Sequence, residues 1–191
     1  MNNFENREAA LALADKWFEA FHKSPRFAGL TDSQRRKASA ITGFFAQHAF
    51  DYLGLTPDKW DEAAVAECLT EIFPRKVSAE PAFFEATSPV LSAFFTFLSE
   101  TALLSEGLGL AQTAQTVQDE ALAAVGDRSN WGPAKSFVMA ALESGVDVRN
   151  ADALRAFTLE FNLRQMAHSA GPNRPAASAQ HDFPRAPRSG R

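Results

Sequence analysis

Residues 71–105 constrain the fold more than any other part of the chain. They hold six of its seventeen phenylalanines and three prolines, Pro74, Pro81 and Pro89. Proline lacks a backbone N–H and disfavours the helical conformation in the residue before it, so each proline is expected to end one helix or begin another. Pro74 is expected to end the helix before it, and Ser88-Pro89 to begin the most apolar helix. Because phenylalanine carries no polar group, the segment predicts the central buried element of the fold.

Amphipathic helices are expected on both sides of this element, because apolar residues recur every three or four positions, as on one face of a helix. The spacing predicts helices over residues 3–22, 32–53, 61–73, 89–104, 110–125, 133–144 and 152–168, with a short helical turn over 80–86. No segment alternates apolar and polar residues long enough to predict a strand. The predicted fold class is all-α, a single irregular or orthogonal bundle of about seven helices.

Local signals fix the ends of the second helix. Thr31 or Asp32 is expected to cap its first turn with a side-chain oxygen. Gly54 is expected to end it in the left-handed conformation that glycine adopts without steric cost. The single cysteine, Cys68, excludes an internal disulfide and falls in a helical pattern, which predicts a small buried apolar residue in a reducing cytoplasm.

The composition changes after residue 168, which predicts a helical domain over residues 1–168 and a flexible tail containing Pro and Arg over 169–191. The tail has too few large apolar residues to compensate for the entropy of ordering. Its net charge is +3, whereas residues 1–168 carry −7. An acidic body argues against a nucleic-acid partner. The chain has neither an apolar run of eighteen residues nor a signal-peptide pattern, so no membrane association is expected.

Residues 127–137, DRSNWGPAKSF, are the most site-like segment. The Gly-Pro pair begins a helix, whose free N–H groups favour an anion, and nearby cations favour the same ligand. The flat indole ring of Trp131 would form one wall of such a binding site. The alternative is that this ring only anchors the loop and that Lys135 is solvated. Arg75 and Lys76, just after the third predicted helix, are a second possible contact for an anion or an acidic partner. The candidate ligand- or partner-binding residues are therefore Arg75, Lys76, Arg128, Trp131, Lys135 and Ser136.

Other combinations of polar residues give weaker signals. His48 and Asp51 share a helix face, but one helix cannot supply a complete ligand set for a metal. Glu67 and Glu71 lie one turn apart without the histidine that a di-metal bundle would need, so they are expected on a solvated face. The triplet 35–37, Arg-Arg-Lys, is typical of an exposed helix face. No motif predicts catalytic residues, a metal or a cofactor.

Three short motifs carry a resemblance to a known family. FPRKV at 73–77, FFTFL at 94–98 and WGPAK at 131–135 occur in this order. The order resembles an uncharacterised bacterial helical region found alone or joined to plasmid ORF-3-like and SEC-C-type proteins, over roughly residues 15–165. The resemblance implies an all-helical, cytoplasmic bacterial protein and no particular activity. The chain lacks the metal-binding cysteine cluster of SEC-C-type proteins, so the resemblance implies no zinc site.

The predicted function is a non-catalytic module that binds a protein partner through an apolar groove or the tail. Exposed apolar patches mark such surfaces, and the rings beyond a single helix stripe are the places to find one: Phe44, Phe50, Phe84 and Phe97. One alternative is nucleic-acid or phosphate-ligand binding through the basic loop residues, which requires those residues to share a face. Another is an enzyme whose site is assembled from distant residues, such as His48 and a carboxylate on another helix.

Overall fold

A computed structural model describes residues 3–169, all of whose regular elements are helices. The predicted all-α fold class is therefore confirmed. The chain divides into two compact units, Met1–Gly145 and Val146–Arg191. Apart from Ser169, which ends the last helix, the predicted tail lies outside the described residues. The first unit contains α1 (Asn3–His22), α2 (Pro25–Ala28), α3 (Asp32–Leu53), α4 (Glu62–Glu67), α5 (Phe73–Lys76), α6 (Pro81–Glu100), α7 (Gly107–Thr116), α8 (Gln118–Gly126) and α9 (Pro133–Glu143).

Helix α6 is the centre of the first unit. It contacts α1, α2, α3, α7 and α8, and its buried residues include five of the phenylalanines in the sequence. Among the described residues, α6 is the helix long and apolar enough to cross a membrane by length and composition, yet 67% of that apolar segment is buried within the structure. Its apolar composition thus fits its place in the core, as the sequence predicted for this region.

Pro89 does not begin this helix, contrary to the sequence prediction. Helix α6 starts at Pro81, so Pro89 lies inside it and Ser88 is a buried interior residue rather than a cap. The helix ends at Glu100, before the predicted residue 104. Proline normally breaks a helix by removing one hydrogen bond. Here apolar residues on both sides of the proline are buried, and their packing outweighs the local cost.

The third predicted helix also continues past its proline. Asp61 caps α4, accepting a hydrogen bond from the backbone N–H of Ala64 at 2.7 Å. A π-helical turn, Cys68–Ile72, then joins α4 to α5, and Pro74 lies within the last turn. In the π turn the N–H of Phe73 donates to the carbonyl of Cys68, five residues earlier. This wider turn directly precedes the proline, which has no N–H to donate.

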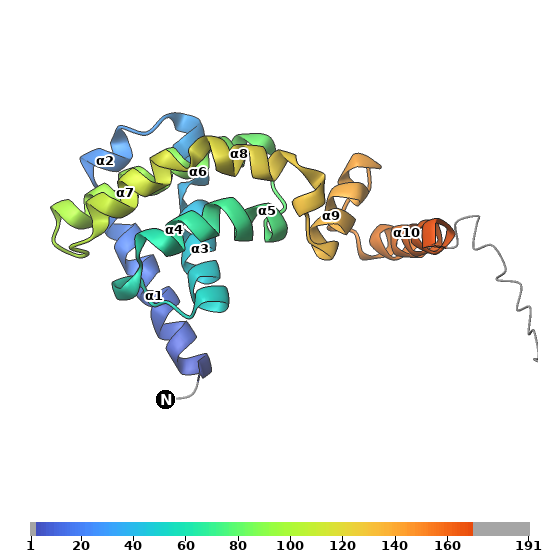
Figure 1. Cartoon of the computed structure of the whole chain (residues 1–191), viewed down its shortest axis with the longest axis horizontal. Helices are drawn as coiled ribbons and strands as arrows, with labels where there is room; N and C mark the ends of the chain where they lie inside the picture. Colours follow the sequence, from blue (N-terminus) through green and yellow to red (C-terminus); the bar gives the residue numbers. More distant parts are fainter. Residues whose placement is uncertain (1–2, 170–191) are drawn as a thin grey trace, which may run out of the picture. The chain divides into compact units, whose positions relative to one another are not determined.

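The predicted helix over residues 110–125 is two helices. Helices α7 and α8 are separated at Val117, whose backbone leaves the helical region. Figure 1 shows α7 and α8 continuing in one direction beside the line formed by α4 and α5. In this arrangement α4 contacts α7, and α5 contacts α8. The C-terminal ends of α5 and α8 therefore lie on the same side of the unit.

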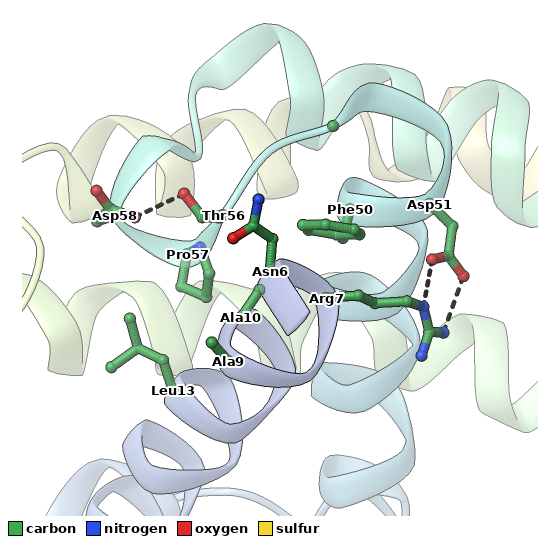
Figure 2. A pocket seen from close by; sticks show the side chains of 11 residues that line it. Asn6, Arg7, Ala9, Ala10, Leu13, Phe50, Asp51, Thr56, Pro57 and Asp58 are labelled. Atoms are coloured by element: carbon green, nitrogen blue, oxygen red, sulfur yellow. Dashed lines mark hydrogen bonds and ion pairs between the residues drawn. The ribbon is translucent and has the colours of Figure 1, made fainter. Parts of the chain in front are cut away.

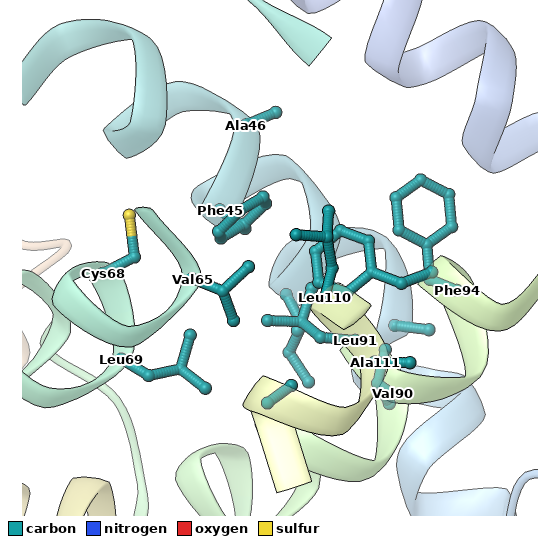
Figure 3. Close-up of a cluster of buried hydrophobic side chains, with 14 of the residues drawn as sticks. Phe45, Ala46, Val65, Cys68, Leu69, Val90, Leu91, Phe94, Leu110 and Ala111 are labelled. Carbon is teal, nitrogen blue, oxygen red and sulfur yellow. The ribbon is translucent and has the colours of Figure 1, made fainter. Parts of the chain in front are cut away.

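The core between these helices is almost entirely apolar (Figure 3). It brings together side chains from α3, α4, the π turn, α6 and α7, which Figure 3 labels as Phe45, Ala46, Val65, Cys68, Leu69, Val90, Leu91, Phe94, Leu110 and Ala111. Cys68 is fully buried, as predicted, and burial raises the pKa of its thiol to about 12. It is therefore an unreactive packing residue rather than a nucleophile.

The second unit contains α10 (Ala151–Ser169). The side-chain oxygen of Asn150 accepts hydrogen bonds from the backbone N–H groups of Asp152 and Ala153, at 3.0 and 3.1 Å. Asn150 is thus the N-cap that satisfies the first free donors of the helix.

Candidate functional site

The segment after α8 closes the C-terminal end of that helix. The side-chain amide of Asn130 donates to the carbonyl of Ala124, and the indole N–H of Trp131 donates to the carbonyl of Val125, each at 3.0 Å. The last carbonyls of a helix have no partner within it. The two side chains supply those partners, so Trp131 does anchor the loop, as one of the sequence interpretations proposed.

The same segment also closes the C-terminal end of α5. The backbone N–H of Gly132 donates to the carbonyl of Arg75 at 3.1 Å. A Cβ atom at position 132 would lie 2.8 Å from that oxygen, so this approach requires glycine. The Nζ atom of Lys135 donates to the carbonyl of Pro74 at 2.7 Å. A cation is favourable at this end of a helix because the carbonyl dipoles give it partial negative charge.

Lys135 is buried, with 3% of its surface exposed, contrary to the interpretation that it is solvated. Its Nζ atom lies 5.1 Å from the ring centroid of Phe84 and 5.2 Å from that of Trp131. None of the ion pairs in the described part of the chain involves Lys135. An ammonium group has three donors, and the bond to Pro74 uses one. Burial lowers the pKa of Lys135 to about 8.

A cleft of about 510 Å³ is lined by Lys135 and by Phe84 and Trp131, the two rings nearest its ammonium group. Most of its wall is apolar and comes from α6, α8, α9 and the loops between them. The lining residues that carry the argument are Phe84, Leu122, Val125, Trp131, Lys135 and Met139. Arg128 lies at the edge, with its guanidinium carbon 5.2 Å from the centroid of Trp131 and an Nη2 atom 2.6 Å from Glu143. Trp131 therefore contacts two cations, of which Lys135 alone is buried.

Only some of the six candidate binding residues predicted from the sequence lie close together in the structure. Arg128, Trp131 and Lys135 surround the apolar cleft, while Arg75 lines a neighbouring hollow of about 420 Å³ with Trp131. Lys76 lies elsewhere, with its Nζ atom 5.1 Å from the ring centroid of Tyr52. Ser136 is half-buried in α9 and lines neither cavity. Binding by these residues stays a prediction.

Sequence reasoning did not identify the apolar half of the cleft. Leu122 and Val125 come from α8 and Met139 from α9, and none of the three belongs to a motif. The sequence predicted an anion site at the first turn of α9, with Lys135 as one of its cations. In the structure the ammonium group of Lys135 instead donates to the carbonyl of Pro74 in α5. The sequence feature that did point to this region was Trp131 next to the Gly132-Pro133 pair, which indicated a loop with a large aromatic side chain.

A larger cleft of about 910 Å³ lies between α1 and the end of α3 (Figure 2). Its charged groups have partners in the cleft wall. Arg7 binds both carboxylate oxygens of Asp51, with distances of 2.6 and 3.0 Å, and this contact lowers the pKa of Asp51. The hydroxyl of Thr56 donates to Asp58 at 2.7 Å and lowers its pKa as well. Because these charges are already paired, this cleft is the weaker candidate despite its size.

The catalytic alternative gains no assembled site in the described residues. His48 is buried, with its Nδ1 atom 2.7 Å from the carbonyl of Phe44, and it lines neither cleft. Asp51, three residues later, binds Arg7 instead. Glu67 and Glu71 are exposed. Across residues 3–169, no cluster of three or more histidine, cysteine or acidic side chains is arranged to hold a metal.

The basic triplet makes local contacts. Arg35 donates to the carbonyls of Ala28 and Leu30 at 2.8 and 2.6 Å. Lys37 lies 3.4 Å from the carboxylate of Glu80. Arg35 and Lys37 therefore support the packing of α3, and Arg36 is the exposed member of the triplet. One exposed cation does not make a basic surface for a polyanion.

The four phenylalanines expected to mark a partner surface differ in burial. Phe84 and Phe97 are buried, Phe50 is half-buried, and Phe44 is 37% exposed. Only Phe84 lines the apolar cleft. An exposed phenylalanine patch is thus not the feature that identifies a partner site here.

Comparison with protein-family models, characterised proteins and solved structures found no match to the chain. The family resemblance based on the three short motifs stays a prediction.

Proposed function

We propose that this protein is a non-catalytic interaction module whose cleft beside Lys135 binds a segment of a partner protein. The segment carries a bulky apolar side chain next to a carboxylate. The observation behind the proposal is the pairing of an apolar cleft of about 510 Å³ with a buried ammonium group in its wall.

The apolar part of the ligand follows from the cleft lining. Phe84 and Trp131 offer aromatic walls, and Met139 offers an adaptable one. Binding energy at protein interfaces concentrates where one large side chain fills such a pocket. The volume falls within the range of about 300–1,000 Å³ that is usual for ligand pockets. One bulky side chain and its neighbours fit this space.

The carboxylate follows from the state of Lys135. A buried charge is costly unless it is paired. The hydrogen bond to Pro74 uses one donor of the ammonium group, and burial lowers its pKa to about 8. A carboxylate from a ligand would accept the remaining donors and favour the charged form. Binding is therefore expected to raise the pKa of Lys135.

The two alternatives have less support in the contacts. A phosphate or nucleic-acid ligand calls for several cations on one face, but Arg128 pairs with Glu143 and Lys37 lies beside Glu80. An enzyme calls for a nucleophile or base with a partner that activates it. The lowered pKa of Lys135 is compatible with such chemistry, but its hydrogen bond to Pro74 serves packing.

Selection of peptides from a random library by the full-length protein tests the proposal. The expected peptides place Asp, Glu or a terminal carboxylate beside a Phe, Trp, Leu or Met residue. Lys135→Met is expected to remove the acidic preference while the apolar preference persists. Lys76→Met is the matched control, because this lysine lies over Tyr52 and outside the cleft.

Adding the selected peptide stepwise to the protein while recording its tryptophan fluorescence gives a second measurement of binding. Trp131 lines the cleft, whereas Trp17 and Trp60 are buried in the core. A spectral change that Trp131→Phe abolishes supports binding in the cleft. An acidic preference that survives Lys135→Met, or peptides without any shared apolar residue, would show that the proposal is wrong.

A further inference from the structure

Helix α10 carries apolar residues on two opposite faces. Successive residues of a helix are rotated by about 100°, so positions three and four apart share a face. One face holds Leu154, Phe157 and Phe161; the opposite face holds Leu159, Leu163 and Met166. An ordinary surface helix needs only one apolar face. The second face of α10 therefore calls for its own explanation.

The two faces differ in burial. Phe157 is 6% exposed, whereas Leu159, Leu163 and Met166 are 70%, 67% and 68% exposed. Among the exposed large apolar residues in the described part of the chain, these three have the highest exposed fractions. Three such side chains on successive turns form a continuous apolar stripe, and stripes of this kind mark interaction surfaces.

The spacing of the stripe is that of a coiled-coil seam. Ala156, Leu159, Leu163 and Met166 are separated by three, four and three residues, which corresponds to alternating a and d positions of a heptad. With this assignment, Arg155 takes a g position and Glu160 the following e position. Both side chains are exposed. Arg155 also lies 3.5 Å from Asp152 on its own helix, but this solvent-exposed pair is weak and can exchange for a partner on another chain.

We propose that the stripe Leu159–Leu163–Met166 binds the same stripe of a second copy of this chain in a parallel, two-stranded seam. In a parallel pair, a g residue lies near the e residue five positions later on the other helix. Arg155 of each copy therefore faces Glu160 of the other, so the helix is complementary to itself in charge. The two-fold symmetry gives this ion pair twice.

The antiparallel arrangement is disfavoured by the same charges. With Leu159 of one helix opposite Leu163 of the other, e positions flank e positions, and the two copies of Glu160 lie near each other. Like charges at close range oppose association. The ion pairs thus select orientation, while the leucines supply the attraction.

The seam is short, and a weak dimer is expected. The nineteen residues of α10 provide fewer than three heptads, less than a stable isolated coiled coil needs. A dissociation constant on the order of 10 μM is expected, well above that of large obligate interfaces. Dimerisation would give each assembly two copies of the partner-binding cleft, which increases avidity for a multivalent partner.

Sedimentation equilibrium of the full-length protein over a wide concentration range tests this proposal. The expected result is a reversible dimer. Leu163→Glu is expected to raise the dissociation constant more than about 100-fold, because it buries a charge in the seam. Leu108→Glu is the matched control: Leu108 is 60% exposed on α7 in the other unit, and its replacement leaves the dimer unchanged.

Charge exchange tests the register. Arg155→Glu or Glu160→Arg alone is expected to weaken the dimer about fivefold, and the double exchange to restore it. Leu159→Cys tests the orientation, because only a parallel seam brings the two new cysteines together. The native Cys68 is buried and does not compete.

Three outcomes would overturn the proposal. A monomer at all concentrations up to about 1 mM excludes a dimer of useful affinity. A dimer that resists Leu163→Glu has its interface elsewhere. A dimer that Leu163→Glu disrupts, but that Leu159→Cys does not cross-link under oxidation, has the wrong orientation.

Discussion

The Nζ atom of Lys135 lies 2.7 Å from the carbonyl oxygen of Pro74, 61 residues earlier in the chain. The contact links the first turn of α9 to the last turn of α5, where helix carbonyls lack donors. The lysine fills that role while Phe84 and Trp131 contact its ammonium group. One buried lysine thus caps a helix end and lines the cleft, so we expect its charge state to affect both stability and the proposed binding.

The free energy of unfolding is expected to rise with pH above about 8. The pKa of Lys135 falls from 10.5 to about 8 on folding, because burial disfavours the charged form. Between these values the unfolded chain binds more protons than the folded one, so raising the pH favours the folded state. Urea unfolding at pH 7, 8 and 9 is expected to show this rise in the native protein but not in Lys135→Met.

Cys68 affects the same measurement with the opposite sign. Its pKa rises from 9.0 to about 12 on folding, so its contribution to stability is present below pH 9 and is lost as the pH rises further. The contribution of Lys135 is therefore read between pH 8 and 9, and Cys68→Ala removes the interference above that range. An equal rise in native protein and Lys135→Met would mean that another group causes it.

The close approach of α7 to α6 depends on a glycine. A Cβ atom at position 107 would collide with the carbonyl oxygen of Phe95 and lie 3.0 Å from the Cβ atom of Ser99. Both obstacles belong to a buried, well-packed helix. Gly107→Ala is therefore expected to lower the free energy of unfolding by about 1–3 kcal/mol, despite the better helix propensity of alanine. Chemical denaturation measures the change.

Gly109 provides the matched control on the same helix. A Cβ atom there would meet the carboxylate of Glu62, the far end of a flexible side chain, which can move. Gly109→Ala is expected to change the free energy of unfolding by less than about 1 kcal/mol. If the two variants lost equal stability, backbone contact between α6 and α7 would not be the reason.

The boundaries predicted correctly from the sequence are those fixed by neighbouring residues. Thr31 and Gln34 form a reciprocal capping box at the start of α3, and Gly54 ends the helix with a φ of 71°. Each interaction joins residues at most five positions apart, so its pattern is visible in the local sequence. The all-α class followed from apolar spacing for the same reason.

The incorrect predictions concern residues whose helical boundary or burial is decided by contacts with distant parts of the chain rather than by neighbouring residues. Pro89 follows a rule for helix starts, but it lies in a helix whose flanking residues are buried by α3 and α7. Lys135 looks solvated in sequence because nothing nearby shows that the end of α5 will cover it. The apolar half of the cleft was invisible for this reason as well, since its walls meet only after the helices pack.

Pro89 is expected to be a destabilising residue in α6. It cannot donate to the carbonyl of Glu85, and its ring crowds the preceding turn. Pro89→Ala is therefore expected to raise the free energy of unfolding by about 1–3 kcal/mol. Pro81→Ala is the control, because Pro81 occupies the first turn of the helix, where no donor is lost, and a change below about 1 kcal/mol is expected. Loss of stability in Pro89→Ala would mean that the core is packed around a distorted helix.

The indole nitrogen of Trp60 is buried without a hydrogen-bond partner in the described part of the chain, while its ring packs against Trp17, Phe45 and Phe95. A buried donor without a partner costs about 1–3 kcal/mol, which offsets part of the packing gain of the large ring. Trp60→Phe removes this donor together with some volume, and because the two effects oppose each other we expect the free energy of unfolding to change by less than about 1 kcal/mol. Trp60→Ala is expected to lose about 3–5 kcal/mol, because it leaves a cavity. Thermal and urea unfolding of the two variants measure the difference, and similar losses in both would show that the indole nitrogen does have an acceptor in solution.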